Sequence, residues 1–336
     1  MVDLRSDTVT RPSHPMLEAM MRAEVGDDVL GDDPSVQQLE AMAAQLSGKD
    51  AALFTPSGTM ANQIAIRCWT QPGDEVLMDA GAHPFSYEAG APGAISGVLV
   101  RQLPAPGGIL DPDTVFSSIR PANDHFAPPT LLCIENTCNH AGGTVYPLET
   151  LETLGSGAAE LGLRVHLDGA RVFNACVAQG VDLRDIACHA DSVSFCLSKG
   201  LGAPVGSVLC GPKEWIRRAR RVRKMLGGGM RQSGYLAAAG IYALSHNIAR
   251  LVDDHRRARR LYDGLTSMGF TSTEPQTNIL YVDVPSARVA AEGLAARGVH
   301  TIATGKDVIR LVTHLDVDDA GVEQALSAFG ALAERT

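Results

Sequence analysis

The sequence of 336 residues predicts an α/β fold in which helices cover both faces of a mainly parallel sheet. The first observation is that apolar segments of strand length alternate with stretches long enough to form helices. The second is that most of these segments lack polar alternation, which is typical of strands buried on both faces. The predicted strands lie at residues 76–78, 97–103, 131–135, 165–168, 192–197 and 206–210.

The pattern changes in the last third of the chain, which indicates a second structural unit. Residues 235–265 predict one or two long helices, and residues 278–284 and 308–312 predict strands of a small α+β domain. A chain of this length has room for one large and one smaller domain. We therefore expect a large domain over residues 1–250, N-terminal segment included, and a small C-terminal domain over residues 251–336.

The charge balance argues against polyanionic partners. The formal net charge is -9 and the pI is about 5.6, so no broad positive field would attract nucleic acid or an anionic membrane. An arginine-rich stretch runs from Lys213 to Lys224. Its charges are more consistent with a solvated helix face than with nucleic-acid contacts.

The cysteines and the N-terminus bear on the cellular compartment. Seven cysteines form no Cys-x-x-Cys pair, and their odd number favours free thiols in a reducing compartment. The segment from Met1 to Asp7 has no apolar signal core, and no apolar run approaches the ~20 residues needed to span a bilayer. We expect a soluble, cytoplasmic protein.

Lys199 and Asp168 are the residues whose surroundings point to a chemistry. Lys199 lies among small residues, which leave room for a flat aldehyde cofactor held as a Schiff base by the lysine amine. Asp168 follows an apolar strand, so its carboxylate would emerge at a strand's carboxyl end, where ligands bind in α/β sheets. There it would keep a pyridinium nitrogen protonated and make the ring an electron sink. The pair predicts a pyridoxal 5'-phosphate enzyme whose cofactor binds in the large domain.

Two segments are candidates for binding the phosphate of such a cofactor. Ser57, Gly58 and Thr59 precede a predicted helix, whose N-terminus would present amides and hydroxyls to a phosphate. Alone, the triplet is equally an ordinary helix cap, and the predicted cofactor lysine favours the phosphate role. A triple glycine precedes Arg231; it is either a linker or a loop that brings the guanidinium to an anion.

Two histidines and two arginines are further candidates. His83 and His125 lie in loops beside predicted strands, where an imidazole could stack on the ring or act as a base, or be merely structural. Arg171 and Arg310 would approach one cleft from different domains and clamp a substrate carboxylate, unless each pairs with a surface acid. The ten histidines show neither H-E-x-x-H nor paired-cysteine spacing, so we expect no catalytic transition metal.

Motifs along nearly the whole chain carry a further signal. They are Asp3–Pro12, Gly26–Val29, Ser57–Asn62, His83–Phe85 with Tyr87 and Glu88, Glu135–Thr137, His166–Arg171, Ser198–Ser207, Arg223–Gln232 and Arg310–His314. Together they closely resemble the low-specificity L-threonine aldolases, pyridoxal phosphate enzymes of the aspartate aminotransferase-like fold (fold type I). The resemblance implies a seven-stranded sheet in the large domain.

The resemblance also implies a role for each candidate residue. Lys199 would be the Schiff-base lysine, Asp168 would pair with the pyridinium nitrogen, and His83 would stack on the ring. His83, His125 or a water that they position would act as the base. The remaining roles are phosphate binding by Ser57, Gly58 and Thr59, and substrate carboxylate binding by Ser6, Arg171 and Arg310, with Arg171 also near the cofactor.

Members of this family share active sites between subunits, which implies a further role for the basic stretch. Arg231, together with Lys224, would contact a phosphate across a subunit interface, in a homotetramer built from tight dimers. Relatives also bind a structural cation near Thr8, Thr10 and Ser198, although no spacing in this sequence indicates one.

Leu30 is the main departure from the family pattern, because most relatives carry a tyrosine there, near the substrate. An apolar, shorter side chain would favour bulkier β-substituents and loosen discrimination of the β-hydroxyl configuration. The alternative is that Leu30 simply packs there without any effect on selectivity.

The implied reaction is the reversible cleavage of L-threonine, L-allo-threonine and other β-hydroxy-α-amino acids to glycine and an aldehyde. The rival interpretation is another fold type I enzyme, such as a β-eliminating lyase, an aminotransferase or a phenylserine-preferring aldolase. A non-catalytic pyridoxal-binding regulator would need an attached DNA-binding module, and the first motif leaves no room for one before Asp3.

Overall fold

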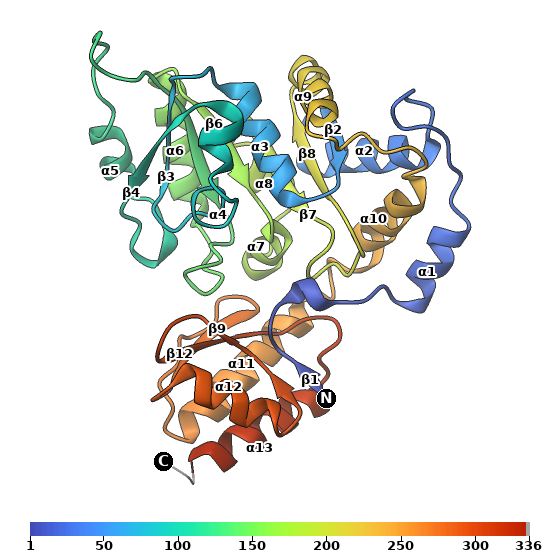
Figure 1. Ribbon diagram of the computed structural model, residues 1–336, viewed down its shortest axis with the longest axis vertical. Coiled ribbons are helices and arrows are strands. Elements are labelled where there is room, and N and C mark those ends of the chain that lie inside the picture. Colours follow the sequence, from blue (N-terminus) through green and yellow to red (C-terminus); the bar gives the residue numbers. More distant parts are fainter. Residues whose placement is uncertain (334–336) are drawn as a thin grey trace.

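A seven-stranded sheet organises the first two thirds of the chain (Figure 1). In the computed structural model, which describes residues 1–333, the strand order is β2-β8-β7-β6-β5-β3-β4, and β8 alone runs antiparallel to the rest. The strands are β2 (Ala51–Thr55), β3 (Glu75–Asp79), β4 (Leu99–Leu103), β5 (Pro129–Glu135), β6 (Arg164–Asp168), β7 (Ser192–Cys196) and β8 (Ser207–Gly211). The predicted mainly parallel sheet is confirmed, with β2 added to the six strands read from the sequence.

Both faces of this sheet are buried, as the absence of polar alternation predicts. Along β3, Leu77 packs into the largest apolar cluster, whereas Val76 and Met78 pack into a cluster on the other face. Helices α3 (Gly58–Trp69) and α9 (Lys213–Met225) contribute to the clusters opposite the largest one. The largest cluster contains residues of α1 (His14–Met21), α2 (Pro34–Ser47), α5 (Pro112–Ser117), α6 (Leu148–Glu160), α7 (Val172–Gln179), α8 (Leu183–Ala187) and α10 (Gly234–His246).

Local sequence explains where the long helices begin and end, and α2 illustrates it. The Asp33 carboxylate accepts a hydrogen bond from the amide of Val36 at 3.1 Å, and Pro34 occupies the first turn, where a missing N–H costs nothing. Gly48 ends the helix with a φ of 67°, a left-handed conformation that favours glycine. Short helical turns complete this part: η1 (Asp7–Val9), α4 (His83–Ser86), η2 (Pro92–Ser96) and η3 (Pro106–Gly108).

The last third of the chain forms a second, smaller core, in the lower part of Figure 1. The antiparallel strands β11 (Ile302–Ala303), β12 (Val308–Val312) and β9 (Ile279–Asp283) pack with α11 (Leu251–Ser267), α12 (Ala287–Ala295) and α13 (Asp319–Ala333). The predicted long helical stretch is two helices, α10 and α11.

The N-terminal segment belongs to this second core by its packing. Strand β1 (Val2–Asp3) pairs in parallel with β10 (Val299–His300), and Val2 and Leu4 pack among the buried residues of α11 and α13. Helix α11 begins at Leu251. The division near residue 250 stays a prediction, but the first residues reach across it.

Two findings concern the length of the helices and the state of the cysteines. None of the described helices is long and apolar enough to cross a membrane. All seven cysteines are free thiols, as their spacing predicts.

Candidate active site

A cavity of about 680 Å³ lies at the carboxyl ends of β6 and β7, where the small core approaches the large sheet. Parallel sheets bind ligands at this edge because every strand ends there and delivers a loop. The structure brings to this cavity most of the residues that the sequence singles out. They are Ser6, Ser57, Gly58, Thr59, His83, Asp168, Arg171, Lys199 and Arg310.

Asp168 ends β6 with its carboxylate held from two sides. Its Oδ2 accepts a hydrogen bond from Nδ2 of Asn62 at 2.7 Å, and its Oδ1 accepts one from the amide of Ala170 at 3.1 Å. The carboxylate of Asp168 is therefore held in place on the cavity wall, where its predicted partner is a pyridinium nitrogen.

His83 lies on the same wall, at the first residue of α4, and its ring is part of a buried network. Nδ1 lies 2.9 Å from Oε1 of Glu88, which also accepts a hydrogen bond from Asn62 at 2.9 Å. Burial lowers the pKa of His83, but the hydrogen bond to Glu88 and the charges of Asp168 and Glu88 outweigh it, so the pKa is raised above its ordinary value. His83 thus carries a proton more readily than a free imidazole.

A second buried carboxylate, Glu135, lies at the end of β5. Its oxygens accept hydrogen bonds from the amides of His83 at 2.8 Å and Asn139 at 3.0 Å. Burial and the charge of Asp168 raise the pKa of Glu135 to about 7. Glu135 therefore connects the loops that carry His83 and Asn139.

The N-terminus of α3 forms the opposite side of the cavity. The Ser57 hydroxyl accepts a hydrogen bond from the amide of Met60 at 3.2 Å, so Ser57 is the helix cap that the sequence analysis weighed. Capping leaves the first turn's other amides free to bind an anion. A side chain at Gly58 would lie 2.9 Å from Sγ of Cys196, so glycine is what lets the helix start this close to β7.

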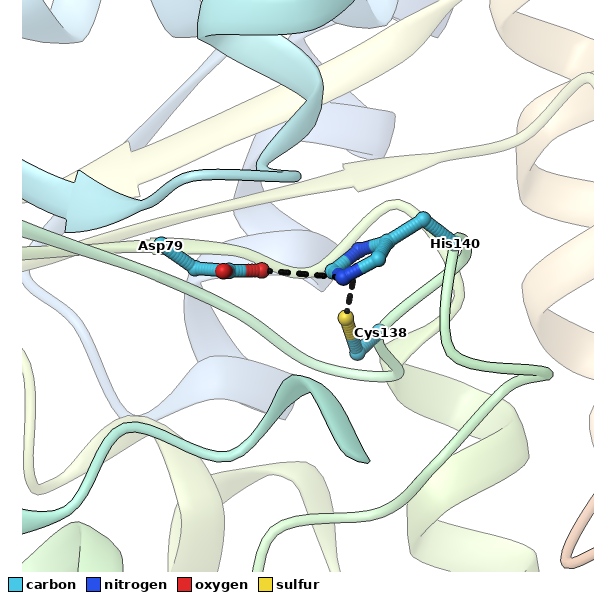
Figure 2. A group of neighbouring side chains, drawn as sticks. All are labelled: Asp79, Cys138 and His140. Atoms are coloured by element: carbon cyan, nitrogen blue, oxygen red, sulfur yellow. Dashed lines mark hydrogen bonds and ion pairs between the residues drawn. The ribbon is translucent and has the colours of Figure 1, made fainter. Parts of the chain in front are cut away.

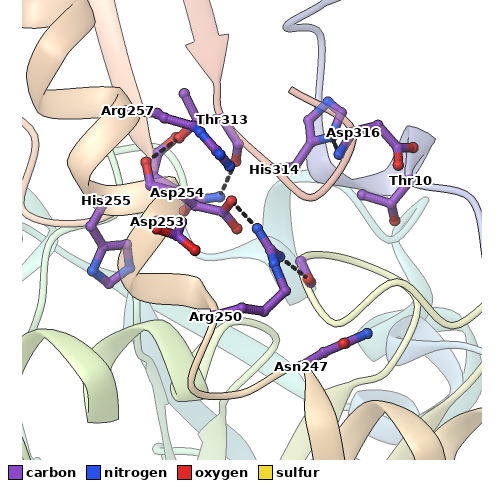
Figure 3. A network of polar contacts seen from close by, with 12 residues as sticks. Thr10, Asn247, Arg250, Asp253, Asp254, His255, Arg257, Thr313, His314 and Asp316 are labelled. Carbon is purple, nitrogen blue, oxygen red and sulfur yellow. Dashed lines mark hydrogen bonds and ion pairs between the residues drawn. The ribbon is translucent and has the colours of Figure 1, made fainter. Parts of the chain in front are cut away.

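Lys199 lies in a loop whose backbone carbonyls accept hydrogen bonds from three side chains. The Lys199 carbonyl accepts from Thr10 Oγ1 at 2.9 Å, the next carbonyl from Arg250 Nη1 at 3.3 Å, and the one after from Asn247 Nδ2 at 2.8 Å. Figure 3 shows these donors together with Asp254, which pairs with Arg250. The loop is thereby fixed while Lys199 lines the cavity.

The two arginines predicted to clamp a carboxylate differ in their surroundings. Arg171 is buried and donates from Nε and Nη2 to both oxygens of Asp7, each at 2.7 Å. Although burial opposes ionisation, Arg171 lowers the pKa of Asp7 to about 2. The charge of Arg171 is therefore already neutralised inside the protein.

Arg310, on β12, has no such counterion among residues 1–333. Its Nη groups donate to Oδ1 of Asn139 at 3.4 Å and to the carbonyl of Arg5 at 3.2 Å, and its Nε is buried without a hydrogen-bond partner in that part of the chain. Burial and the nearby charge of Arg171 lower the pKa of Arg310. A carboxylate in the cavity would relieve both the unpaired Nε and the uncompensated charge.

Four predicted residues lie outside the cavity of their own chain. His125 is in the exposed loop between α5 and β5, and Leu30 is 75 % exposed in the loop before α2. Lys224 lies in the last turn of α9, and Arg231 is exposed and pairs with Asp27 at 2.8 Å. None of the four lines the pocket. Their predicted roles stay predictions and would have to be performed in another subunit.

Several residues of the network received no individual role from the sequence. Asn62 lies one helical turn after Gly58 and so faces the same way, which the sequence could have indicated. The others are brought in by tertiary packing alone: Asp7, Glu88, Glu135 and Asn139.

Known proteins resemble this chain over nearly its whole length. A family model described as beta-eliminating lyase matches residues 3–287. The "Low specificity L-threonine aldolase" of Escherichia coli (strain K12) is 48% identical over 318 residues, which cover 94% of this chain and 95% of that protein. The chain belongs to the L-threonine aldolase family. Membership confirms the predicted carbon–carbon lyase class and the pyridoxal phosphate cofactor.

Solved structures confirm the fold predicted from the family resemblance. The threonine aldolase of Leishmania major superimposes with a TM-score of 0.86 at 23% identity, covering 99% of this chain and 100% of that one. An aspartate aminotransferase of Thermus thermophilus gives a TM-score of 0.75 at 19% identity, covering 99% of this chain and 91% of that one. The L-threonine aldolase family and this chain thus share the aspartate aminotransferase-like architecture.

The donor set of the cavity fits pyridoxal phosphate. Lys199 supplies an amine for an aldehyde, Asp168 a carboxylate for a pyridinium nitrogen, and the α3 N-terminus an anion site. The structure gives the Lys199 amine no hydrogen bond among residues 1–333. All three groups line the same cavity.

Proposed function

We propose that this chain cleaves L-threonine, L-allo-threonine and related β-hydroxy-α-amino acids to glycine and an aldehyde, in a reversible retro-aldol reaction. The observation that carries the proposal is one cavity that combines Lys199 and Asp168 with an unpaired arginine, Arg310. The first two address the cofactor, and the third addresses an amino acid's carboxylate. Pyridoxal phosphate, when bound, supplies the electron sink that stabilises the carbanion left at Cα.

The residues around the substrate bind its carboxylate and set its orientation. Arg310, with Ser6 beside it in the cavity, holds the α-carboxylate and so fixes which bond at Cα stands perpendicular to the cofactor ring. Arg171 orients this arrangement through Asn139, whose Oδ1 accepts from Nη1 of Arg171 at 3.1 Å and from Arg310. Because its charge is matched by Asp7, Arg171 acts here as a positioning residue.

His83 is the histidine that would take the β-hydroxyl proton. It lines the cavity, and Glu88 holds its Nδ1 and so fixes the ring. When the base, His83 or a water that it binds, takes the hydroxyl proton, the Cα–Cβ bond breaks and its electron pair stays on Cα. The aldehyde leaves, and protonation of Cα gives glycine. His125 would serve as the base only from another subunit.

The competing function is β-elimination, which the description of the matching family model favours. The two reactions differ in their products, because elimination releases ammonia and a keto acid whereas retro-aldol cleavage releases glycine and an aldehyde. The test is product identification from L-threonine, L-allo-threonine and the L-phenylserine epimers, with the Lys199→Ala protein as the blank. Stoichiometric glycine and aldehyde support the proposal, and ammonia with a keto acid would overturn it.

We also propose a homotetramer built from tight dimers, working in the cytoplasm. Val29, Leu30 and Met225 are exposed apolar side chains, and Val29 lies with Lys224 and Gly229 at the end of α9. Exposed apolar side chains in the loop before α2 and at the end of α9 are consistent with an interaction surface. The amide of Asp28 donates to the carbonyl of Arg231 at 3.1 Å, so the loop that carries Leu30 and the glycine-rich loop would enter a neighbouring cavity together.

Arg231→Ala is expected to weaken cofactor retention about ten- to a hundredfold, because one charge-assisted contact to phosphate is worth ~1.5–3 kcal/mol. The measurement is the apparent cofactor affinity after dialysis. Arg217→Ala, an exposed arginine of α9 paired with Glu214, is the matched control and should retain cofactor. Mixing Arg231→Ala with Lys199→Ala subunits should restore activity at limiting cofactor, since one site then has both residues. Absence of that rescue would argue against a shared site.

Leu30→Tyr is expected to change substrate preference in favour of one β-hydroxyl configuration, because a phenol hydroxyl would give one epimer a polar partner. The measurement is kcat/KM for L-threonine, L-allo-threonine and both L-phenylserine epimers. Leu161→Tyr, at an exposed position after α6, is the control. If all ratios stay within about twofold, less than ~0.5 kcal/mol of differential transition-state binding, Leu30 does not determine specificity.

A further inference from the structure

Three side chains outside the cofactor cavity converge behind it. Asp79 ends β3, and Cys138 and His140 lie in the loop after β5, the neighbouring strand (Figure 2). Sγ of Cys138 lies 3.1 Å from Nδ1 of His140, and Nε2 of His140 lies 3.3 Å from Oδ2 of Asp79. One donor atom of each residue lies within 4.8 Å of the other two. A thiol, an imidazole and a carboxylate are therefore close enough together to be ligands of one metal ion.

The buried carboxylate of the cluster is weakly satisfied. Oδ2 of Asp79 makes no hydrogen bond in the described structure, and its one ion-pair contact there, Nε2 of His140 at 3.3 Å, supplies a positive charge only when the imidazole is protonated. Cys138 is only 1% exposed, whereas the His140 side chain is 30% exposed and leaves one side open to water. A buried carboxylate oxygen without a donor costs free energy unless a positive charge lies against it.

Two glycines enclose the cluster and fix its side chains. A Cβ at Gly81 would lie 2.5 Å from Nε2 of His140, and a Cβ at Gly108 would lie 2.3 Å from Sγ of Cys138. Gly108 also has a φ of 79°, a conformation that favours glycine. The backbone therefore approaches both donors as closely as it can, and the donors have little room to turn away from each other.

An alternative use of the three groups is a nucleophilic thiol activated by His140 and oriented by Asp79. The location of the sulfur opposes it, because Cys138 is buried and does not line the cofactor cavity. A substrate therefore has no access to the sulfur, whereas the partly exposed His140 leaves one side of the cluster open to water.

We propose that Asp79, Cys138 and His140 bind a structural zinc ion whose fourth position holds water. Thiolate, imidazole and carboxylate are the ligands zinc takes, at about 2.3, 2.0–2.1 and 2.0–2.2 Å, whereas magnesium and calcium take oxygen alone. Only one imidazole nitrogen can bind the ion, so one of the two present contacts of His140 is exchanged for a metal bond. The thiol proton leaves to solvent when the ion binds.

The ion would act on the active site through Asn139, which lies between two of its ligands. Asn139 Oδ1 accepts from both Arg171 and Arg310, and its carbonyl accepts from the hydroxyl of Tyr281 at 3.2 Å. A zinc ion would tie this loop to the end of β3, just ahead of His83. The sequence analysis expected no catalytic transition metal; a Cys-x-His pair completed by a distant aspartate matches none of the spacings it considered.

The test measures zinc bound to the holoenzyme after removal of loosely held metal, by competition with a chromophoric chelator. We expect one ion per chain, and at least about 100-fold weaker binding in Cys138→Ser and His140→Gln, since even groups that only orient a ligand contribute about 10- to 100-fold. Cys188→Ser and His14→Gln, an exposed thiol and an exposed imidazole elsewhere, are matched controls and should bind normally.

A second readout protects the test against a variant that does not fold. Cobalt(II) added to the unmodified holoenzyme should give a thiolate-to-cobalt band in the difference spectrum, and that band should persist in Cys188→Ser. Failure of the wild type to bind zinc or to give this band would overturn the proposal. Equal zinc affinity in folded Cys138→Ser and wild type would overturn it as well.

Discussion

Replacement of Lys199 by alanine is expected to remove the cofactor's covalent attachment and lower kcat by at least about 10³-fold. Lys199 is the one described lysine that lines the cavity, and nothing else there offers an amine to an aldehyde. Loss of a group that takes part in proton transfer alone typically costs ~10²–10⁴-fold, and loss of the attachment adds to it. The measurements are steady-state cleavage of L-threonine and the cofactor's visible absorbance.

Borohydride reduction followed by peptide mapping makes the assignment specific. In the wild type, cofactor should be fixed to the peptide that contains Lys199, and in Lys199→Ala no lysine peptide should carry it in comparable yield. Lys306→Ala, at an exposed position before β12, is the matched control and should keep both absorbance and activity. A reduced adduct of undiminished yield on another lysine of the variant would contradict the role of Lys199.

The sequence was most informative about the sheet, because burial on both faces leaves a direct signature. Uninterrupted apolar segments, such as residues 76–78 of β3 and 131–134 of β5, are typical of strands buried on both faces, so their alternation with helices predicts the layers. The shortest strands were missed because they contain too few apolar residues to form a recognisable pattern. These are β1, β10 and β11, with two residues each. Their position depends on partners far away in the chain, such as Val299 for Val2.

The site could be predicted where one residue type determines the chemistry. A Schiff base to the cofactor needs a lysine amine, and a carboxylate can keep the ring nitrogen protonated; Lys199 and Asp168 both line the cavity. The sequence does not show which side chains contact each other in the fold. Asp7 is the counterion of Arg171, and Glu88 contacts the ring of His83, only because the fold brings these residues together. A single subunit likewise gives no test of Arg231 or Leu30, because both face away from their own cavity.

Arg310→Ala and Arg171→Ala, although both change a cavity arginine, are expected to fail in different ways. Arg310 has an unpaired Nε and no counterion, so its loss should raise KM for L-threonine about ten- to a hundredfold, equivalent to ~1.5–3 kcal/mol, with little change in stability. Loss of Arg171 leaves Asp7 buried and unpaired, which typically costs ~3–5 kcal/mol of folding free energy. Urea unfolding and steady-state kinetics measured on both variants separate the two effects.

The pH dependence of unfolding gives the ion pair an independent test, even if Arg171→Ala does not fold. The pKa of Asp7 is lowered to about 2 in the folded chain, from an ordinary value of 3.8. A lowered pKa stabilises the fold above pH ~3.8, and this contribution is lost as the pH falls towards 2. This contribution amounts to about 2 kcal/mol.

Asp7→Asn keeps the shape of the side chain but has no carboxylate to protonate, so the stability of this variant should depend less on pH in that window. Identical acid unfolding of Asp7→Asn and wild type would show that the Arg171–Asp7 ion pair does not stabilise the fold. Equal kinetics in both arginine variants would show that Arg310 has no separate role in binding the carboxylate.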